Sequence, residues 1–156
     1  MRRAALLLFV TVLLAGCGGS SSSGGGKSAG GGDRLTRAEF AAKADAICGR
    51  YQQKSKSVGQ AKDLADLARI FDRMLPLLDN AMSELRALKP PKSQQHTVDR
   101  WLAQSAVARH DLQQMRDKAK AKDMKGVQAA FERAAADNKE SSRLAKKLGL
   151  KACSED

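Results

Sequence analysis

The stretch KDLADLARIFDRMLPLLDNAMSELRAL, residues 62 to 88, decides the fold because its apolar residues recur every three or four positions. The stripe comprises Leu64, Leu67, Phe71, Met74, Leu75, Leu78, Ala81, Met82, Leu85 and Leu88. This spacing is typical of a helix that buries one face. Pro76 lies inside the stripe, where it removes a backbone donor and clashes with the preceding turn, so we expect one kinked helix rather than two.

Three more helices are predicted around this stretch, and no segment shows the two-residue period of a strand. Thr36 and Glu39 form a capping-box pattern that starts the first helix, which should end near Gly59. The prolines within residues 89 to 92 stop the second helix. Asp123 is expected to cap the fourth helix, and Gly149 to end it in the left-handed conformation.

The predicted inward faces complete the architecture. They carry Phe40, Ala44, Ile47, Cys48 and Tyr51 in the first helix, Val98, Trp101, Leu102, Ser105, Ala108, Leu112, Met115 and Ala119 in the third, and Val127, Ala130, Phe131, Ala134, Asn138, Ser141, Ala145 and Leu148 in the fourth. Short connections between four helices of similar length predict a single all-α domain, an up-down-up-down four-helix bundle over residues 34 to 156.

The first residues of the chain have the organisation of an export signal. Arg2 and Arg3 precede an apolar run over residues 4 to 15, which is too short to span a bilayer, since spanning takes about 20 residues. The segment Leu14-Ala15-Gly16-Cys17 resembles a bacterial lipobox. The resemblance implies a lipoprotein signal peptide over residues 1 to 16 and a diacylglyceryl group on Cys17; the alternative is an ordinary secretory cleavage site with an incidental cysteine. A lipidated Cys17 predicts a protein anchored at the extracytoplasmic face of the cell membrane.

Residues 17 to 33 are predicted to form a tether behind the lipidated cysteine. Of the sixteen residues from Gly18 to Asp33, thirteen are Gly or Ser, a composition with nothing to bury. A flexible chain of this length holds the next domain roughly 20 to 24 Å from the lipid on average.

Two of the three cysteines, Cys48 and Cys153, remain for the exported domain. An oxidising exterior favours a disulfide between them. Two buried free thiols or a metal pair are the alternatives, although no CxxC or CxxH spacing supports a metal site.

Two short motifs surround these cysteines, Ala44-Asp45-Ala46-Ile47-Cys48 and Leu148-Gly149-Leu150-Lys151-Ala152-Cys153. With them the chain resembles small helical lipoproteins of high-GC Gram-positive bacteria. The resemblance implies a helical bundle and a disulfide between Cys48 in the first helix and Cys153 in the C-terminal tail, and it brings no activity. We expect the tail after Gly149 to fold back along the first helix, because Cys48 lies well inside that helix.

The search for chemistry yields no catalytic residue, metal ligand set or cofactor motif. His96 and His110 are fourteen residues apart on or near one helix, about 21 Å, and cannot share a metal ion. HExxH, GxSxG, CxxCH and a phosphate-binding glycine loop are all absent from the sequence. The sequence therefore predicts a protein that is not an enzyme.

The basic charge points to an anionic partner. Residues 34 to 156 hold 25 Lys and Arg against 16 Asp and Glu. Export and the scarcity of aromatic residues argue against nucleic acid, which leaves anionic lipid headgroups, anionic envelope polymers or a protein partner. The connections between helices 1 and 2 and between helices 3 and 4 should both lie at the end away from the tether. The residues predicted to bind a polyanion there are Lys118, Lys120, Lys122 and Lys125, and the alternative is a solvated cap without a role.

These observations predict a membrane-anchored binding or structural module of the cell envelope. The alternative function is a carrier of a small apolar molecule, haem or metal in a pocket of the bundle. Such a pocket would lie at mid-height, where Ala44, Ser105, Ala108, Ala134 and Asn138 are expected to meet, although close helix packing is favoured there.

Overall fold

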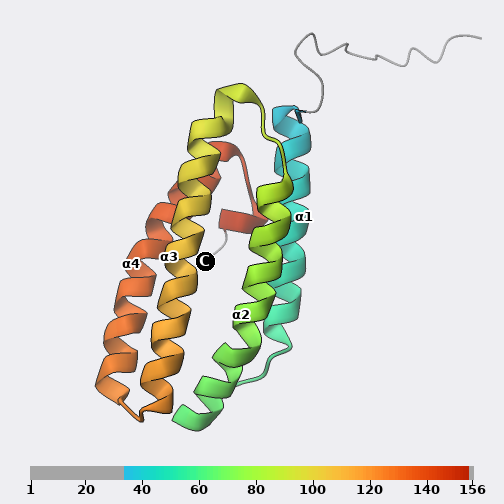
Figure 1. The fold of residues 1–156 in the computed structure, drawn as a ribbon. Helices are drawn as coiled ribbons and strands as arrows, with labels where there is room; N and C mark the ends of the chain where they lie inside the picture. The colour runs from blue at the N-terminus through green and yellow to red at the C-terminus, as the bar shows by residue number, and fades with distance from the viewer. Residues whose placement is uncertain (1–33, 155–156) are drawn as a thin grey trace, which may run out of the picture. The chain divides into compact units, whose positions relative to one another are not determined.

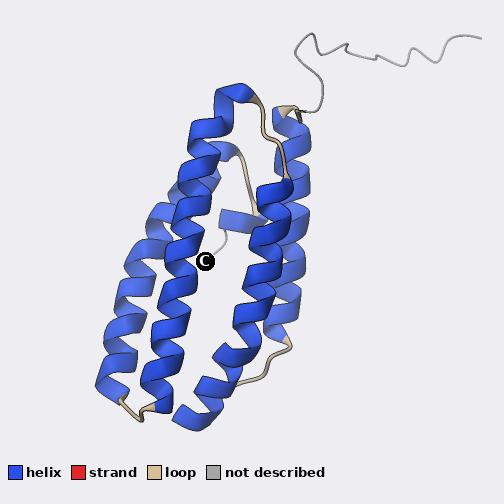
Figure 2. Ribbon diagram, viewed as in Figure 1, coloured by secondary structure: helices blue, strands red, loops and turns tan. Residues whose placement is uncertain are grey.

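The computed structural model describes residues 34 to 154, and this part of the chain is helical throughout apart from its connections (Figures 1 and 2). Its elements are α1 (Arg37–Lys56), α2 (Leu64–Ala87), the 3₁₀ turn η1 (Lys92–Gln94), α3 (Gln95–Lys120), α4 (Met124–Leu148) and the 3₁₀ turn η2 (Ala152–Ser154). The predicted signal peptide, Cys17 and the tether lie outside the described residues.

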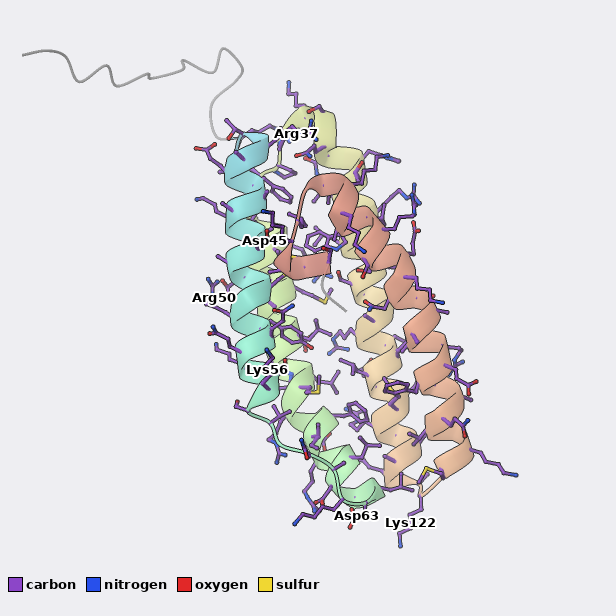
Figure 3. All side chains as sticks on the ribbon, turned by 180° about the vertical axis from the view of Figure 1, so that it is seen from behind. Arg37, Asp45, Arg50, Lys56, Asp63 and Lys122 are labelled. Atoms are coloured by element: carbon purple, nitrogen blue, oxygen red, sulfur yellow. A yellow bond between two sulfur atoms is a disulfide. The ribbon has the colours of Figure 1, made fainter. Side chains whose placement is uncertain are left out.

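The helices alternate in direction and pack in chain order, as the sequence predicts for an up-down-up-down bundle. α1 packs against α2, α2 against α3, and α3 against α4. α1 and α4 lie at opposite sides of this array, and the C-terminal tail lies between them (Figures 1 and 3). The tail therefore closes the bundle on the side where a first and a fourth helix would otherwise meet.

The predicted helix signals act locally as expected. The Thr36 hydroxyl accepts the Glu39 N–H at 3.3 Å, and the Glu39 carboxylate accepts the Thr36 N–H at 2.8 Å, which completes the capping box. α2 runs through Pro76 as one helix. Gly149, with φ of +80°, ends α4 in the left-handed conformation, and Leu150 after it is buried.

The largest buried cluster lies toward the end of the bundle where α1 begins, and all four helices contribute to it. Its members are Phe40, Ala44, Ile47, Ala81, Leu85, Val98, Trp101, Leu144, Ala145, Leu148 and Leu150. Two smaller clusters lie toward the opposite end, one around Ala68, Ala119 and Val127 and the other around Phe71, Met115 and Ala130. Both belong to α2, α3 and α4, so α1 covers only part of the bundle.

This partial cover explains why the predicted inward position of Phe131 is wrong. Phe131 is 63% exposed. Ala145, fourteen residues later on the same face of α4, is fully buried in the cluster that contains α1 residues and Leu150 of the tail. The α1-facing side of α4 is therefore covered at one end and open at the other. Asn138, also predicted to point inward, is exposed on this open stretch.

The C-terminal tail is fixed to α1, and the predicted disulfide is confirmed. Cys48 and Cys153 are bonded, with their Cα atoms 5.2 Å apart. The Asp45 carboxylate accepts the backbone N–H of Lys151 at 2.9 Å, and Gln52 Nε2 donates to the carbonyl of Ala152 at 2.8 Å. Figure 3 shows η2 against α1 at the level of Asp45.

The start of the described chain is held by the connection between α2 and α3. Leu35 donates its N–H to the carbonyl of Lys89 at 2.9 Å, and Arg34 Nη1 donates to the carbonyl of Pro90 at 2.8 Å. Arg34 also reaches Gln95 Oε1 at 2.7 Å. We call this end of the bundle the tether pole.

Candidate functional site

The opposite end, which we call the far pole, consists of residues 62 to 72 and 116 to 125. α2 is capped here by Asp63, whose carboxylate accepts the Asp66 N–H at 2.7 Å. α4 begins at Asp123, whose carboxylate accepts the Gly126 N–H at 2.8 Å, as predicted for its cap. That hydrogen bond, together with Lys118, lowers the pKa of Asp123 below its ordinary value.

The lysines at the end of α1 do not reach the far pole. Asp63 and Lys122 lie beside each other at the end of the bundle, whereas Lys56 lies higher along α1 (Figure 3). α1 ends before the level at which α2 begins, so its last lysines stay on the flank of the bundle. The charges that meet at the far pole come mainly from α2 and from the turn between α3 and α4.

Two of the four predicted polyanion-binding lysines already have partners. Lys118 Nζ lies 3.1 Å from Asp123 Oδ2, and Lys120 Nζ lies 3.0 Å from Asp72 Oδ2. Lys122 and Lys125 form no ion pair with the residues that the structure describes. Of the four lysines predicted to bind a polyanion, two are therefore ion-paired with described residues and two are not.

Lys122 has an unusual backbone conformation. Its φ of +57° makes it the single non-glycine residue with positive φ in the described part of the chain. It follows the C-cap of α3, where glycine is the common residue, and the turn closes with a 2.9 Å hydrogen bond from the Asp123 N–H to the carbonyl of Lys118. A side chain in this conformation costs roughly 1 kcal/mol relative to glycine.

A groove of about 760 Å³ opens beside Lys122. Its apolar lining is formed by Leu64, Ala65, Ala68, Ala119 and Met124, and five charged residues lie around it: Asp63, Arg69, Asp72, Lys120 and Lys122. Ala68 and Ala119 are buried, Ala65 is exposed and Met124 is 61% exposed. The groove is thus a shallow apolar surface whose margin carries three cations and two carboxylates.

The residues of the alternative mid-height pocket do not all meet in one place. Ala44 belongs to the large cluster near the tether pole, whereas Ala134 packs against the cluster around Phe71. The Ser105 hydroxyl donates to the carbonyl of Trp101 in the preceding turn of its own helix, at 3.1 Å. The groove at the far pole was not predicted, because its alanines carry no signal that separates a groove from close packing.

A buried acid on α3 was also missed. Asp111 is 5% exposed, and its Oδ2 atom has no hydrogen-bond partner. Burial raises the pKa of Asp111, and the charge of Asp137 on α4 raises it further, while Arg133 and His110 oppose the change. An aspartate on a helix that also carries exposed charges gives no sign of burial in the sequence.

Other candidate chemistry is sparse. Within residues 34 to 154, no three His, Cys, Asp or Glu side chains come together in a metal-binding arrangement. Each helix of this part of the chain is too short or too polar to cross a membrane. Comparison with models of protein families, with curated proteins and with solved structures finds no match to this chain.

Proposed function

We propose that the protein is a membrane-anchored lipoprotein of the extracytoplasmic face, and that its bundle is a binding module of the cell envelope that contacts an anionic polymer. Lipidation of Cys17 would hold the chain at its N-terminal side. The far pole would then be the surface available for contacts at a distance from the membrane.

One observation carries the choice of partner: Lys122, in the turn before α4, and Lys125, in the first turn of α4, form no ion pair among the described residues. A lysine that already forms an ion pair attracts an added anion less strongly, because part of its charge is already compensated. Unpaired lysines at one end of an elongated domain are free to attract a polyanion.

The test uses the chain from residue 34 to 156, because the buried clusters and the disulfide lie within it. The probe is poly(glycerol phosphate), with phosphatidylglycerol vesicles as a second arm. We expect binding that weakens steeply as salt rises past about 0.15 M, where the screening length is roughly 8 Å. The double variant Lys122→Gln with Lys125→Gln should lose most of this binding.

The matched control removes the same charge elsewhere. Lys43 on α1 and Lys147 on α4 are exposed and lie toward the tether pole. Their double change to Gln should leave binding close to that of the parent. Equal losses in the two double variants would show that net charge alone acts, and salt-independent binding would contradict the proposal. Binding to vesicles without binding to the polymer would assign the surface to lipid instead.

A further inference from the structure

The floor of the far-pole groove is formed by small side chains. Ala68 and Ala119 are buried beneath it, and Leu64, Ala65 and Met124 add apolar surface at its edges. Larger residues at the alanine positions would fill this space. A methionine at the margin is flexible and polarisable, so it can adapt to the surface of a ligand. The floor is suited to a narrow, flexible apolar group.

Of the three cations at the margin of the groove, one forms no ion pair with the described residues. Arg69 is paired with Asp66, and Lys120 is paired with Asp72. Asp63 accepts the Asp66 N–H as the cap of α2. Lys122 forms no ion pair with the described residues, and it stands where glycine would relieve the backbone.

These features together define the chemistry of a ligand. One cation without an ion pair beside an apolar floor matches a molecule with one negative charge and one flexible chain. A polyanion would use the charges of the pole but would leave the apolar floor unoccupied. We propose that the groove binds a long-chain fatty carboxylate, with its acyl chain along Ala65, Ala68 and Ala119 and its carboxylate at Lys122.

The proposal goes beyond polymer binding, although both use Lys122. Variants of two other residues distinguish carboxylate binding from polymer binding, because Ala65 lines the groove and Lys125 does not. Ala65→Phe should abolish binding of the carboxylate and leave polymer binding intact. Lys125→Gln should weaken polymer binding and leave binding of the carboxylate unchanged. Failure of one proposal is therefore distinguishable from failure of the other.

The experiment titrates dodecanoate, below its micelle concentration, into the chain of residues 34 to 156. Calorimetry measures affinity, and amide NMR shifts locate the site. We expect shifts centred on residues 63 to 72 and 119 to 124. Dodecanol lacks the charge and butyrate lacks the chain, and each should bind at least about tenfold more weakly, since a charge-assisted contact and apolar burial both contribute.

Variants of Lys122 give the sharpest result, because stability and binding should change in opposite directions. Lys122→Gly should raise the thermal unfolding midpoint and weaken dodecanoate binding about tenfold. Lys122→Gln should weaken binding equally without that gain in stability, and Lys122→Arg should retain binding. Circular dichroism checks the fold of each variant.

A phenylalanine elsewhere controls for the added bulk of Ala65→Phe. Ala42 is exposed on α1 near the tether pole, and Ala42→Phe should bind dodecanoate like the parent. The proposal is overturned if the folded parent does not bind dodecanoate, if dodecanol binds equally well, or if Ala65→Phe or Lys122→Gly retains the parent's affinity. Amide shifts centred on any other surface would overturn it as well.

Discussion

The Asp45 carboxylate accepts the backbone N–H of Lys151 through both of its oxygens, at 2.9 and 3.0 Å, although the two residues are 106 positions apart. The same carboxylate accepts the Cys153 N–H at 3.3 Å. It therefore acts on η2 as a capping residue acts on a helix, but from a different element. This contact orients the tail so that Cys153 meets Cys48.

Removing this carboxylate should loosen the tail. We expect Asp45→Ala to lower the free energy of unfolding by about 1 to 2 kcal/mol, the usual cost of a lost cap with charge-assisted hydrogen bonds. Urea denaturation of the oxidised protein measures the change. Asp99→Ala, which removes only a hydrogen bond from Gln95 on the surface, is the matched control and should cost less. An unchanged urea midpoint in Asp45→Ala would contradict the capping role.

Loss of the disulfide should have a larger effect. The bond joins residues 105 positions apart, and closing so long a loop in the unfolded chain is worth about 4 to 5 kcal/mol in the chain-entropy model. The double variant Cys48→Ser with Cys153→Ser should lose stability of this order in urea. Reductant should destabilise the parent to a similar extent and leave the variant unaffected. A variant as stable as the oxidised parent would show that the bond contributes little.

Substitution of two phenylalanines tests whether one end of the bundle is covered by α1 and the other is open. Phe40 is fully buried, and Phe40→Ala should cost about 3 to 5 kcal/mol because it leaves a cavity in the large cluster. Phe131→Ala should change stability by less than about 0.5 kcal/mol, since that ring is mostly exposed. Thermal or urea unfolding of both variants measures the contrast. Comparable losses would mean that Phe131 is covered in solution.

Asp111 should make stability depend on pH in a recognisable direction. Its pKa is raised in the folded state, so the folded protein binds its proton more readily than the unfolded chain does. The stability contributed by this group is therefore greatest below the ordinary carboxyl pKa of about 3.9 and falls as pH rises through the folded-state pKa. Asp111→Asn should be more stable than the parent at pH 7.

Thermal unfolding of the two proteins from pH 3 to pH 8 tests this expectation. The advantage of Asp111→Asn should shrink as pH falls toward 4. The parent also holds acids with lowered pKa values, such as Asp79 beside Arg109, and these lose their stabilising effect at low pH in both proteins alike. Only the difference in stability between the two proteins reports on Asp111. A stability difference that stays constant with pH would contradict a raised pKa for the buried Asp111 carboxyl.

The proposed membrane attachment can be tested at Cys17. In cells, Cys17→Ala should leave the precursor without lipid and remove the protein from the detergent-soluble membrane fraction, because the thioether requires the sulfur. Fractionation and mass spectrometry of the N-terminal peptide measure both effects. An unmodified Cys17 in the mature parent protein would contradict the anchor.

Local signals in the sequence were sufficient to predict the helices and the residues near which they end. The stripe of α2, the capping box at Thr36, the cap at Asp123 and the left-handed Gly149 each depend on residues within one or two turns, so they could be predicted without knowing the neighbouring helices. The disulfide followed from the number of cysteines, the predicted export and the resemblance.

Positions that depend on a neighbouring helix could not be predicted in this way. Periodicity places Phe131 on the same face as Ala145, but it does not show that α1 and the tail cover only one end of that face. The pairing of Lys120 with Asp72 depends on the register between α3 and α2. The groove at Ala65 and the burial of Asp111 likewise arise only when separate elements come together.

The attachment of Leu35 to Lys89 and of Arg34 to Pro90 determines how the domain responds to mechanical force. A pull on the chain ahead of Arg34 loads these few hydrogen bonds first and then peels α1 from its N-terminal end. Peeling reaches a covalent stop at Cys48, where the disulfide transfers the load to the tail and to α4. The part of α1 beyond Cys48 is thus protected from peeling by a force applied ahead of Arg34.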